Sequence, residues 1–124
     1  MSKIVGVVGL GAMGSTFAIM LVKAGFEVVG FDVRAAALDE LESNGGKRAG
    51  SPRDVAEQSD VVLLSLPSIE VFQDVISGQG SVTSSGKAGL VIIDTCTMPI
   101  AVKEEGARMV ADSGMTLIDG TVSG

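Results

Sequence analysis

Short apolar runs alternate along this chain with segments whose apolar residues recur at helical spacing. The runs are rich in Val, Ile and Leu, which is typical of strands buried on both faces of a parallel sheet. The predicted strands cover residues 4–8, 27–31, 61–66, 90–93 and 115–118, with 47–50 as a candidate for a further short strand. The predicted helices cover residues 16–23, 35–43, 51–59, 68–76 and 99–113. This alternation predicts an α/β fold with an open, doubly wound parallel sheet, formed by residues 1–124 as a single domain.

A glycine-rich turn follows the first predicted strand. Gly9, Gly11 and Gly14 have the spacing G-x-G-x-x-G, in which the first glycine permits a tight turn, the second admits a pyrophosphate close to the backbone, and the third lets the next helix pack against the sheet. The amino end of that helix would offer unpaired N–H groups to the phosphates. Asp32 stands at the carboxyl end of the second predicted strand, where a carboxylate accepts hydrogen bonds from ribose hydroxyls. The stretch 4–32 therefore predicts a Rossmann-like, dinucleotide-binding unit.

The same stretch has a second interpretation. Residues 4–22 are uncharged and follow Lys3, a pattern that resembles a signal peptide or a membrane span. Four glycines crowd its first half, no small-residue cleavage site follows, and the strand pattern resumes at Glu27. These features favour the strand, turn and helix.

Composition narrows the classes of partner and chemistry. The net charge of −6 disfavours general binding to nucleic acid or to anionic membranes, so an anionic ligand would have to be held locally by backbone amides. The single cysteine, Cys96, excludes an internal disulfide, and the absence of His removes the usual zinc ligand and proton shuttle. We expect a cytoplasmic protein with an aliphatic core and no metal site.

Three further segments follow predicted strands at their carboxyl ends: residues 65–68, 94–99 and 119–124. Each is rich in hydroxyl groups, proline or glycine. Any one of them alone is more simply explained by turn chemistry and helix capping. Because parallel strands bring their carboxyl ends to one edge, the three together predict the wall of a cofactor cleft.

These segments resemble those of the β-hydroxyacid dehydrogenases, which include 3-hydroxyisobutyrate, L-threonate and tartronate semialdehyde enzymes and are related to 6-phosphogluconate dehydrogenase. Gly9-Leu10-Gly11-Ala12-Met13-Gly14 resembles the family's opening signature, and Asp94 to Thr97 with Pro99 resembles its D-x-S-T-x-x-P segment. Asp119 to Gly124 is similar to the start of its D-A-P-V-S-G-G substrate motif. The resemblance implies cofactor contacts at Leu66, Pro67 and Thr97, with Leu66-Pro67-Ser68 beside the nicotinamide ribose and Thr97 beside the nicotinamide. It implies substrate contacts at Ser123 and Gly124.

The chain also departs from that family. Cys96 stands where the family usually has Ser, and Thr121 where it usually has Pro. The family's catalytic lysine and its all-helical second domain lie beyond the substrate motif, so we expect no catalytic residue in this chain and interpret Lys87 and Lys103 as solvated surface charges. The sequence resembles the cofactor domain of a longer enzyme, or a naturally short protein.

Asp32 predicts NAD rather than NADP as the cofactor. A 2′-phosphate about 4 Å from a carboxylate meets repulsion of up to about 4 kcal/mol at an effective dielectric of about 20, which solvent at an exposed rim reduces. Arg34, two positions on, leaves three alternatives open: stacking on the adenine, contact with a 2′-phosphate, or simple solvation.

The resemblance implies hydride transfer from a small β-hydroxyacid to a nicotinamide, in a homo-oligomeric parent enzyme. We expect this chain alone to bind cofactor without turnover. The alternative function is a non-catalytic dinucleotide-binding or sensing module, which needs no second domain. Imine and ketopantoate reductases share the glycine turn but fit the segments at Asp94 and Asp119 less well.

Overall fold

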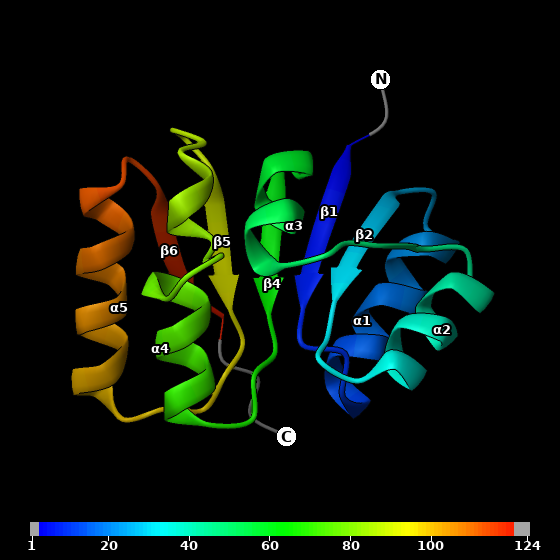
Figure 1. The fold of residues 1–124 in the computed structure, drawn as a ribbon, viewed down its shortest axis with the longest axis horizontal. Coiled ribbons are helices and arrows are strands. Elements are labelled where there is room, and N and C mark those ends of the chain that lie inside the picture. Colours follow the sequence, from blue (N-terminus) through cyan, green and yellow to red (C-terminus); the bar gives the residue numbers. More distant parts are fainter. Residues whose placement is uncertain (1–2, 121–124) are drawn as a thin grey trace.

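A computed structural model describes residues 3–120 of the chain, and Figure 1 shows their arrangement. The described residues form one six-stranded sheet whose strands all run parallel, in the order β3-β2-β1-β4-β5-β6. The strands are β1 (Ile4–Val8), β2 (Glu27–Phe31), β3 (Lys47–Arg48), β4 (Val61–Leu64), β5 (Val91–Asp94) and β6 (Thr116–Asp119). The helices are α1 (Ala12–Lys23), α2 (Ala35–Ser43), α3 (Pro52–Gln58), α4 (Ile69–Ser77) and α5 (Ile100–Asp112), with a 3-10 turn η1 (Thr83–Ser85). The predicted α/β sheet is confirmed.

The strand order reverses between β1 and β4. From β1 the chain moves outward through β2 to β3, and it then returns to the far side of β1 and moves outward again through β5 to β6. A crevice opens at such a reversal, beyond the carboxyl ends of the two central strands, and ligands of open α/β sheets bind there. The glycine-rich turn follows β1, so the topology places it at this point.

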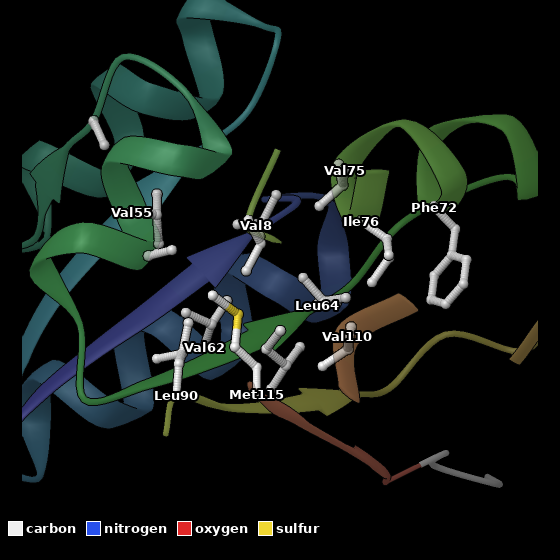
Figure 2. Packing of buried hydrophobic residues seen from close by; sticks show 14 of the residues in the cluster. Val8, Val55, Val62, Leu64, Phe72, Val75, Ile76, Leu90, Val110 and Met115 are labelled. Carbon is white, nitrogen blue, oxygen red and sulfur yellow. The ribbon is translucent and has the colours of Figure 1, made fainter. Parts of the chain in front are cut away.

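The larger core lies between the sheet and α3, α4 and α5. Figure 2 shows the side chains of Phe72 and Ile76 from α4 and Val110 from α5, which lie close to Leu64 of β4. These four side chains are at most 1% exposed. As expected from the composition, aliphatic residues dominate this cluster, and Phe72 is its one fully buried aromatic ring among the described residues.

The opposite face of the sheet is covered only in part. Helices α1 and α2 pack on β1 and β2 through a smaller cluster that includes Val7, Ala18, Val28 and Leu41. On β5 and β6 the same face is more open, and Ile118 is 48% exposed. Strand β6 ends the sheet on this side, and it exposes the apolar side chain of Ile118 on its less protected face.

Most boundaries agree with the sequence patterns to within one residue. Strand β3, a candidate over residues 47–50, ends two residues early at Arg48, and three further features differ. Helix α1 begins at Ala12 rather than residue 16, because Gly14 serves packing inside its first turn and does not delay the helix. Strand β4 ends at Leu64, two residues early, and the predicted loop 77–89 contains η1. Residues 4–22 form strand, turn and helix, and no helix within residues 3–120 is long and apolar enough to cross a membrane.

Candidate functional site

The carboxyl ends of five strands lie in one row across the sheet. Phe31, Val8, Leu64, Asp94 and Asp119 are successive register partners on β2, β1, β4, β5 and β6. The arrowheads of β1, β4 and β5 point to the lower edge in Figure 1, where the following loops gather. The structure thus brings the glycine turn and the segments after β2, β4 and β5 to a common edge, together with the described start of the segment after β6.

Gly9 and Gly14 lock the glycine turn against the sheet. Gly9 has a φ of +93°, a conformation that side chains disfavour, and its N–H donates to the carbonyl of Phe31 over 2.9 Å. A Cβ atom on Gly9 would lie 2.0 Å from the carbonyl oxygen of Ser65, and one on Gly14 would lie 1.9 Å from the carbonyl oxygen of Gly9. A side chain at either position would therefore push the first turn of α1 away from β1 and β4.

Gly11 is different, because its backbone faces open space. Among the described residues, no heavy atom lies within 4 Å of a Cβ atom built on Gly11. Its φ of −68° and ψ of −165° are accessible to any residue, so the turn itself does not require glycine there. Helix α1 starts at the next residue without a side-chain cap at Gly11 and without an acidic residue in its described first turn. This amino end is accessible to an anion.

The Asp32 carboxylate holds the glycine turn in place. Its Oδ2 accepts the N–H of Leu10 over 2.7 Å, and its Oδ1 accepts the N–H of Arg34 over 2.9 Å. Burial acts to raise the pKa of Asp32, but the bonds from the Arg34 side chain and the two backbone N–H groups outweigh it and hold the pKa below its ordinary value. Asp32 is therefore ionised at neutral pH.

The Arg34 side chain pairs with Asp32 and is not simply solvated. Its Nε lies 3.1 Å from Oδ1 and its Nη2 lies 3.3 Å from Oδ2, while Nη2 also donates to the carbonyl of Leu10 over 3.2 Å. The Arg34 side chain remains 60% exposed, so it is accessible from the rim of the site. The arginine thus covers the carboxylate where the sequence predicts a ribose.

The segments after β4 and β5 are tied to each other through Cys96. The N–H of Leu66 donates to the Cys96 sulfur over 3.1 Å, and the Thr95 hydroxyl donates to the carbonyl of Leu64 over 2.6 Å. Burial above all, and then the neighbouring Asp94 carboxylate, raises the pKa of the Cys96 thiol to about 12. The cysteine that departs from the family pattern is therefore a neutral, buried structural contact between two loops.

Pro67 and Thr97 lie on these two segments with exposed side chains. Ser68 caps α4, since its hydroxyl accepts the N–H of Val71 over 3.2 Å. The predicted substrate contacts Ser123 and Gly124, and the departure at Thr121, lie outside the described residues.

Lys87 and Lys103, which the sequence suggests are solvated surface charges, each contact other groups of the fold. The ammonium group of Lys103 lies 2.8 Å from Oδ1 of Asp119 and 3.4 Å from Oδ2 of Asp94, and its side chain is only 13% exposed. Lys87 donates to the carbonyl oxygens of Glu57 and Ser59 at the end of α3. The local sequence pattern does not predict the contacts of these lysines, because their partners lie many positions away in the chain. For Lys103, the sequence signal is the aspartate at the end of each of the two strands.

A groove of about 230 Å³ lies between α4 and α5, away from these loops. Its lining includes Phe72, Ile76, Val102 and Met109, and it contains none of the residues predicted to contact cofactor. The candidate site is instead an open edge formed by loops.

Comparisons with known proteins agree with this arrangement. The sequence profile of a family described as the NAD binding domain of 6-phosphogluconate dehydrogenase matches residues 4–124. The chain is 35% identical over 120 residues to the 2-(hydroxymethyl)glutarate dehydrogenase of Eubacterium barkeri, a match that covers 97% of the chain and 40% of that protein. It is 36% identical over 120 residues to the mitochondrial 3-hydroxyisobutyrate dehydrogenase of Rattus norvegicus, covering 97% of the chain and 36% of that protein.

A solved structure is also similar over the whole chain. The 3-hydroxyisobutyrate dehydrogenase of Mycobacterium tuberculosis, with L-serine, matches with a TM-score of 0.91 at 28% identity, covering 100% of this chain and 42% of that one. The chain therefore spans about two fifths of the length of these relatives.

Proposed function

This chain belongs to the family of the NAD binding domain of 6-phosphogluconate dehydrogenase, and from that premise we propose that it binds NAD at the carboxyl edge of its sheet, as the cofactor-binding part of a β-hydroxyacid dehydrogenase. The pyrophosphate would lie against the turn from Gly9 to Gly14 and the amino end of α1. When bound, NAD supplies an acceptor for a hydride. The residues of this chain bind and orient it.

The contrast among the three glycines carries the proposal. A Cβ atom added to Gly9 or Gly14 would lie no more than 2.0 Å from a backbone oxygen and would clash with it, whereas a Cβ atom on Gly11 would lie in open space. Packing therefore explains two of the glycines and leaves the third unexplained by the fold itself. A ligand that approaches the backbone at Gly11 supplies the missing reason, and a pyrophosphate at the amino end of a helix fits it.

Asp32 and Arg34 support a preference for NAD over NADP. A carboxylate has about four acceptor positions, and two backbone donors and two Arg34 side-chain bonds occupy those of Asp32. The backbone bonds keep the turn folded, so the ribose hydroxyls would replace the two bonds from the exposed guanidinium. The 2′-phosphate of NADP would instead face the charge of the Asp32 carboxylate. At a partly screened rim this repulsion weakens the binding of NADP by about 1–2 kcal/mol, or roughly tenfold in affinity.

The reaction of the whole protein is proposed from the relatives. Both curated relatives described above are named as dehydrogenases of small hydroxyacids, and this chain corresponds to about two fifths of each. The proton of the substrate hydroxyl would be managed by a lysine outside this chain, since Lys103, which lies at this edge, is paired with Asp94 and Asp119. We expect the parent enzyme to be a cytoplasmic homo-oligomer, and the chain by itself to bind cofactor without turnover.

A titration with NADH and, separately, with NADPH tests the proposal. The chain has no Trp or Tyr, so the fluorescence of the nucleotide is measured against little protein background. We expect saturable binding that is roughly tenfold tighter for NADH. The variant Asp32→Asn should weaken NADH binding and bring the two affinities close together, whereas Asp112→Asn at the exposed end of α5 should leave both unchanged.

Three results would count against the proposal. An unchanged affinity ratio in Asp32→Asn would remove the assigned role of that carboxylate. Failure of the wild-type chain to bind either nucleotide would overturn the assignment of the site, and hydroxyacid-dependent NADH production by the purified chain would show that catalysis does not need a lysine from elsewhere.

A further inference from the structure

The carboxyl ends of β5 and β6 are joined by one ammonium group. Lys103, on the first turns of α5, lies 3.4 Å from Oδ2 of Asp94, which ends β5, and 2.8 Å from Oδ1 of Asp119, which ends β6. The Asp94 side chain is 1% exposed and that of Asp119 is 61% exposed. The lysine therefore reaches from an exposed carboxylate inward to a buried one.

The buried carboxylate in turn shapes the loop that follows it. Oδ1 of Asp94 accepts the N–H of Cys96 over 2.8 Å, which turns the chain toward Thr97. The Cys96 sulfur accepts the N–H of Leu66 over 3.1 Å, and the N–H of Gly120 donates to the carbonyl of Asp94 over 2.8 Å. Contacts thus run from Lys103 through Asp94 to the segments after β4, β5 and β6.

From this arrangement we propose that Lys103 is a positioning residue for the nicotinamide half of the cofactor, acting through Asp94 on the loop that carries Thr97. This inference rests on the proposed binding of NAD. Lys103 itself does not contact the cofactor. Its function is to neutralise the buried carboxylate so that Asp94 can hold the Cys96 N–H and fix the loop.

The electrostatics explain why this loop depends on a cation. A buried carboxylate is tolerated when it is both paired and hydrogen-bonded, and removal of its cation leaves an uncompensated charge. The Oδ2 distance of 3.4 Å is long for a hydrogen bond, so at this oxygen the ammonium acts mainly through its charge. Burial acts to lower the pKa of Lys103, but the hydrogen bond with Asp119 and the charge of Asp94 outweigh it and raise the pKa. The group stays positive at neutral pH.

Removal of the Lys103 charge should weaken the contacts with only one half of the cofactor. Gly11 and Asp32, which are proposed to bind the pyrophosphate and the adenosine, follow β1 and β2, and β4 lies between these strands and the strands β5 and β6 that Lys103 joins. ADP-ribose carries the adenosine, pyrophosphate and ribose without the nicotinamide ring. Comparison of NADH with ADP-ribose therefore separates a local effect on the nicotinamide side from a general loss of structure.

The experiment measures the dissociation constants of NADH, by fluorescence, and of ADP-ribose, by calorimetry, for the chain and its variants. Lys103→Met should weaken NADH binding about tenfold, an energy of about 1.4 kcal/mol, and change ADP-ribose binding by less than about twofold. Lys103→Arg keeps the charge and should restore most of the NADH affinity. Arg108→Met removes a cation from the same helix, where it pairs with exposed carboxylates, and should change neither constant.

Folding is controlled with a double variant. If Lys103→Met does not fold, Asp94→Asn with Lys103→Met removes both charges and keeps a carbonyl oxygen for the Cys96 N–H. With no buried charge left to neutralise, the double variant should fold and bind NADH within about twofold of the original chain, so a selective loss of NADH affinity in it would contradict the proposal. In Lys103→Met itself, parallel weakening of both ligands or no weakening of either would overturn the proposal, as would failure of both variants to fold. If the unaltered chain binds ADP-ribose and NADH equally poorly, the proposed NAD site itself is wrong.

Discussion

Replacement of Gly11 by Ala should abolish tight NADH binding while leaving the fold intact. Gly11 is extended, with a φ of −68° and a ψ of −165°, and no described heavy atom lies within 4 Å of its added Cβ. Where the native backbone suits alanine, this change stabilises a protein by about 0.4–1 kcal/mol, because it restricts the unfolded chain. For a domain of this size that corresponds to a rise in Tm of about 1–5 °C.

Binding should change in the opposite direction. The methyl group would stand where the pyrophosphate approaches the backbone, so we expect NADH affinity to fall more than about tenfold, or about 1.4 kcal/mol. Gly14→Ala is the matched comparison. Its Cβ atom would lie 1.9 Å from the Gly9 carbonyl oxygen, a backbone atom that cannot rotate away. Overpacking of about 1–3 kcal/mol, offset by about 1 kcal/mol of helix propensity, should lower its Tm.

Thermal unfolding followed by circular dichroism, together with NADH titration of the same samples, provides the assay. The expected pattern is a Gly11→Ala protein that is at least as stable as the original but does not hold the nucleotide, beside a Gly14→Ala protein that melts earlier. The reasoning is refuted if Gly11→Ala binds NADH within twofold of the original chain, or if it unfolds at a lower temperature.

Two further predictions follow from the perturbed groups. Cys96 is 4% exposed and the pKa of its thiol is raised to about 12, so its thiolate fraction at pH 8 is on the order of a thousandfold below that of a free cysteine. A disulfide reagent should therefore label Cys96 at least about a hundredfold more slowly in the native protein than in denaturant. Equal labelling rates would contradict the structure. The pKa of Asp32 is held below 3.8, because bonds from Arg34 and Leu10 outweigh burial, so the stability that it contributes is present above pH 4 and is lost as pH falls through the lowered pKa. Calorimetric affinity for NAD⁺ should accordingly stay level down to about pH 4, while a decline that begins above pH 5.5 in folded protein would show that another group is titrating.

The elements of the fold were largely predictable from the sequence. Strands buried on both faces, such as Val61–Leu64, are continuous apolar runs in the sequence. Helices such as Pro52–Gln58 are indicated by a capping serine and a proline in the first turn. The glycine spacing and the acidic residue after β2 pointed to the same edge of the sheet. The start of α1 was wrong because a glycine counts against a helix in local propensity, whereas here it serves close packing.

The charge pairs of the site could not be predicted in the same way. Lys103 looks like any lysine on the polar side of a helix, and Cys96 like a single substitution in a loop. Their roles follow from parallel neighbours in the sheet, since the register places Asp94 beside Asp119 and Leu64 beside Asp94. Arg34 is only two positions from Asp32 in sequence, yet its bond to the Leu10 carbonyl depends on β1 and β2 being paired.

The sequence by itself therefore determined the order of strands and helices, the glycine turn and the edge at which a ligand would bind. Each of these depends on residues a few positions apart, through apolar periodicity, backbone conformation and capping. The tertiary structure alone decided which glycine is free of packing, which lysine neutralises the buried carboxylate and which loops are tied together. Those properties depend on distances between segments far apart in the chain, and burial sets the strength of a charge or hydrogen bond only once those segments have come together.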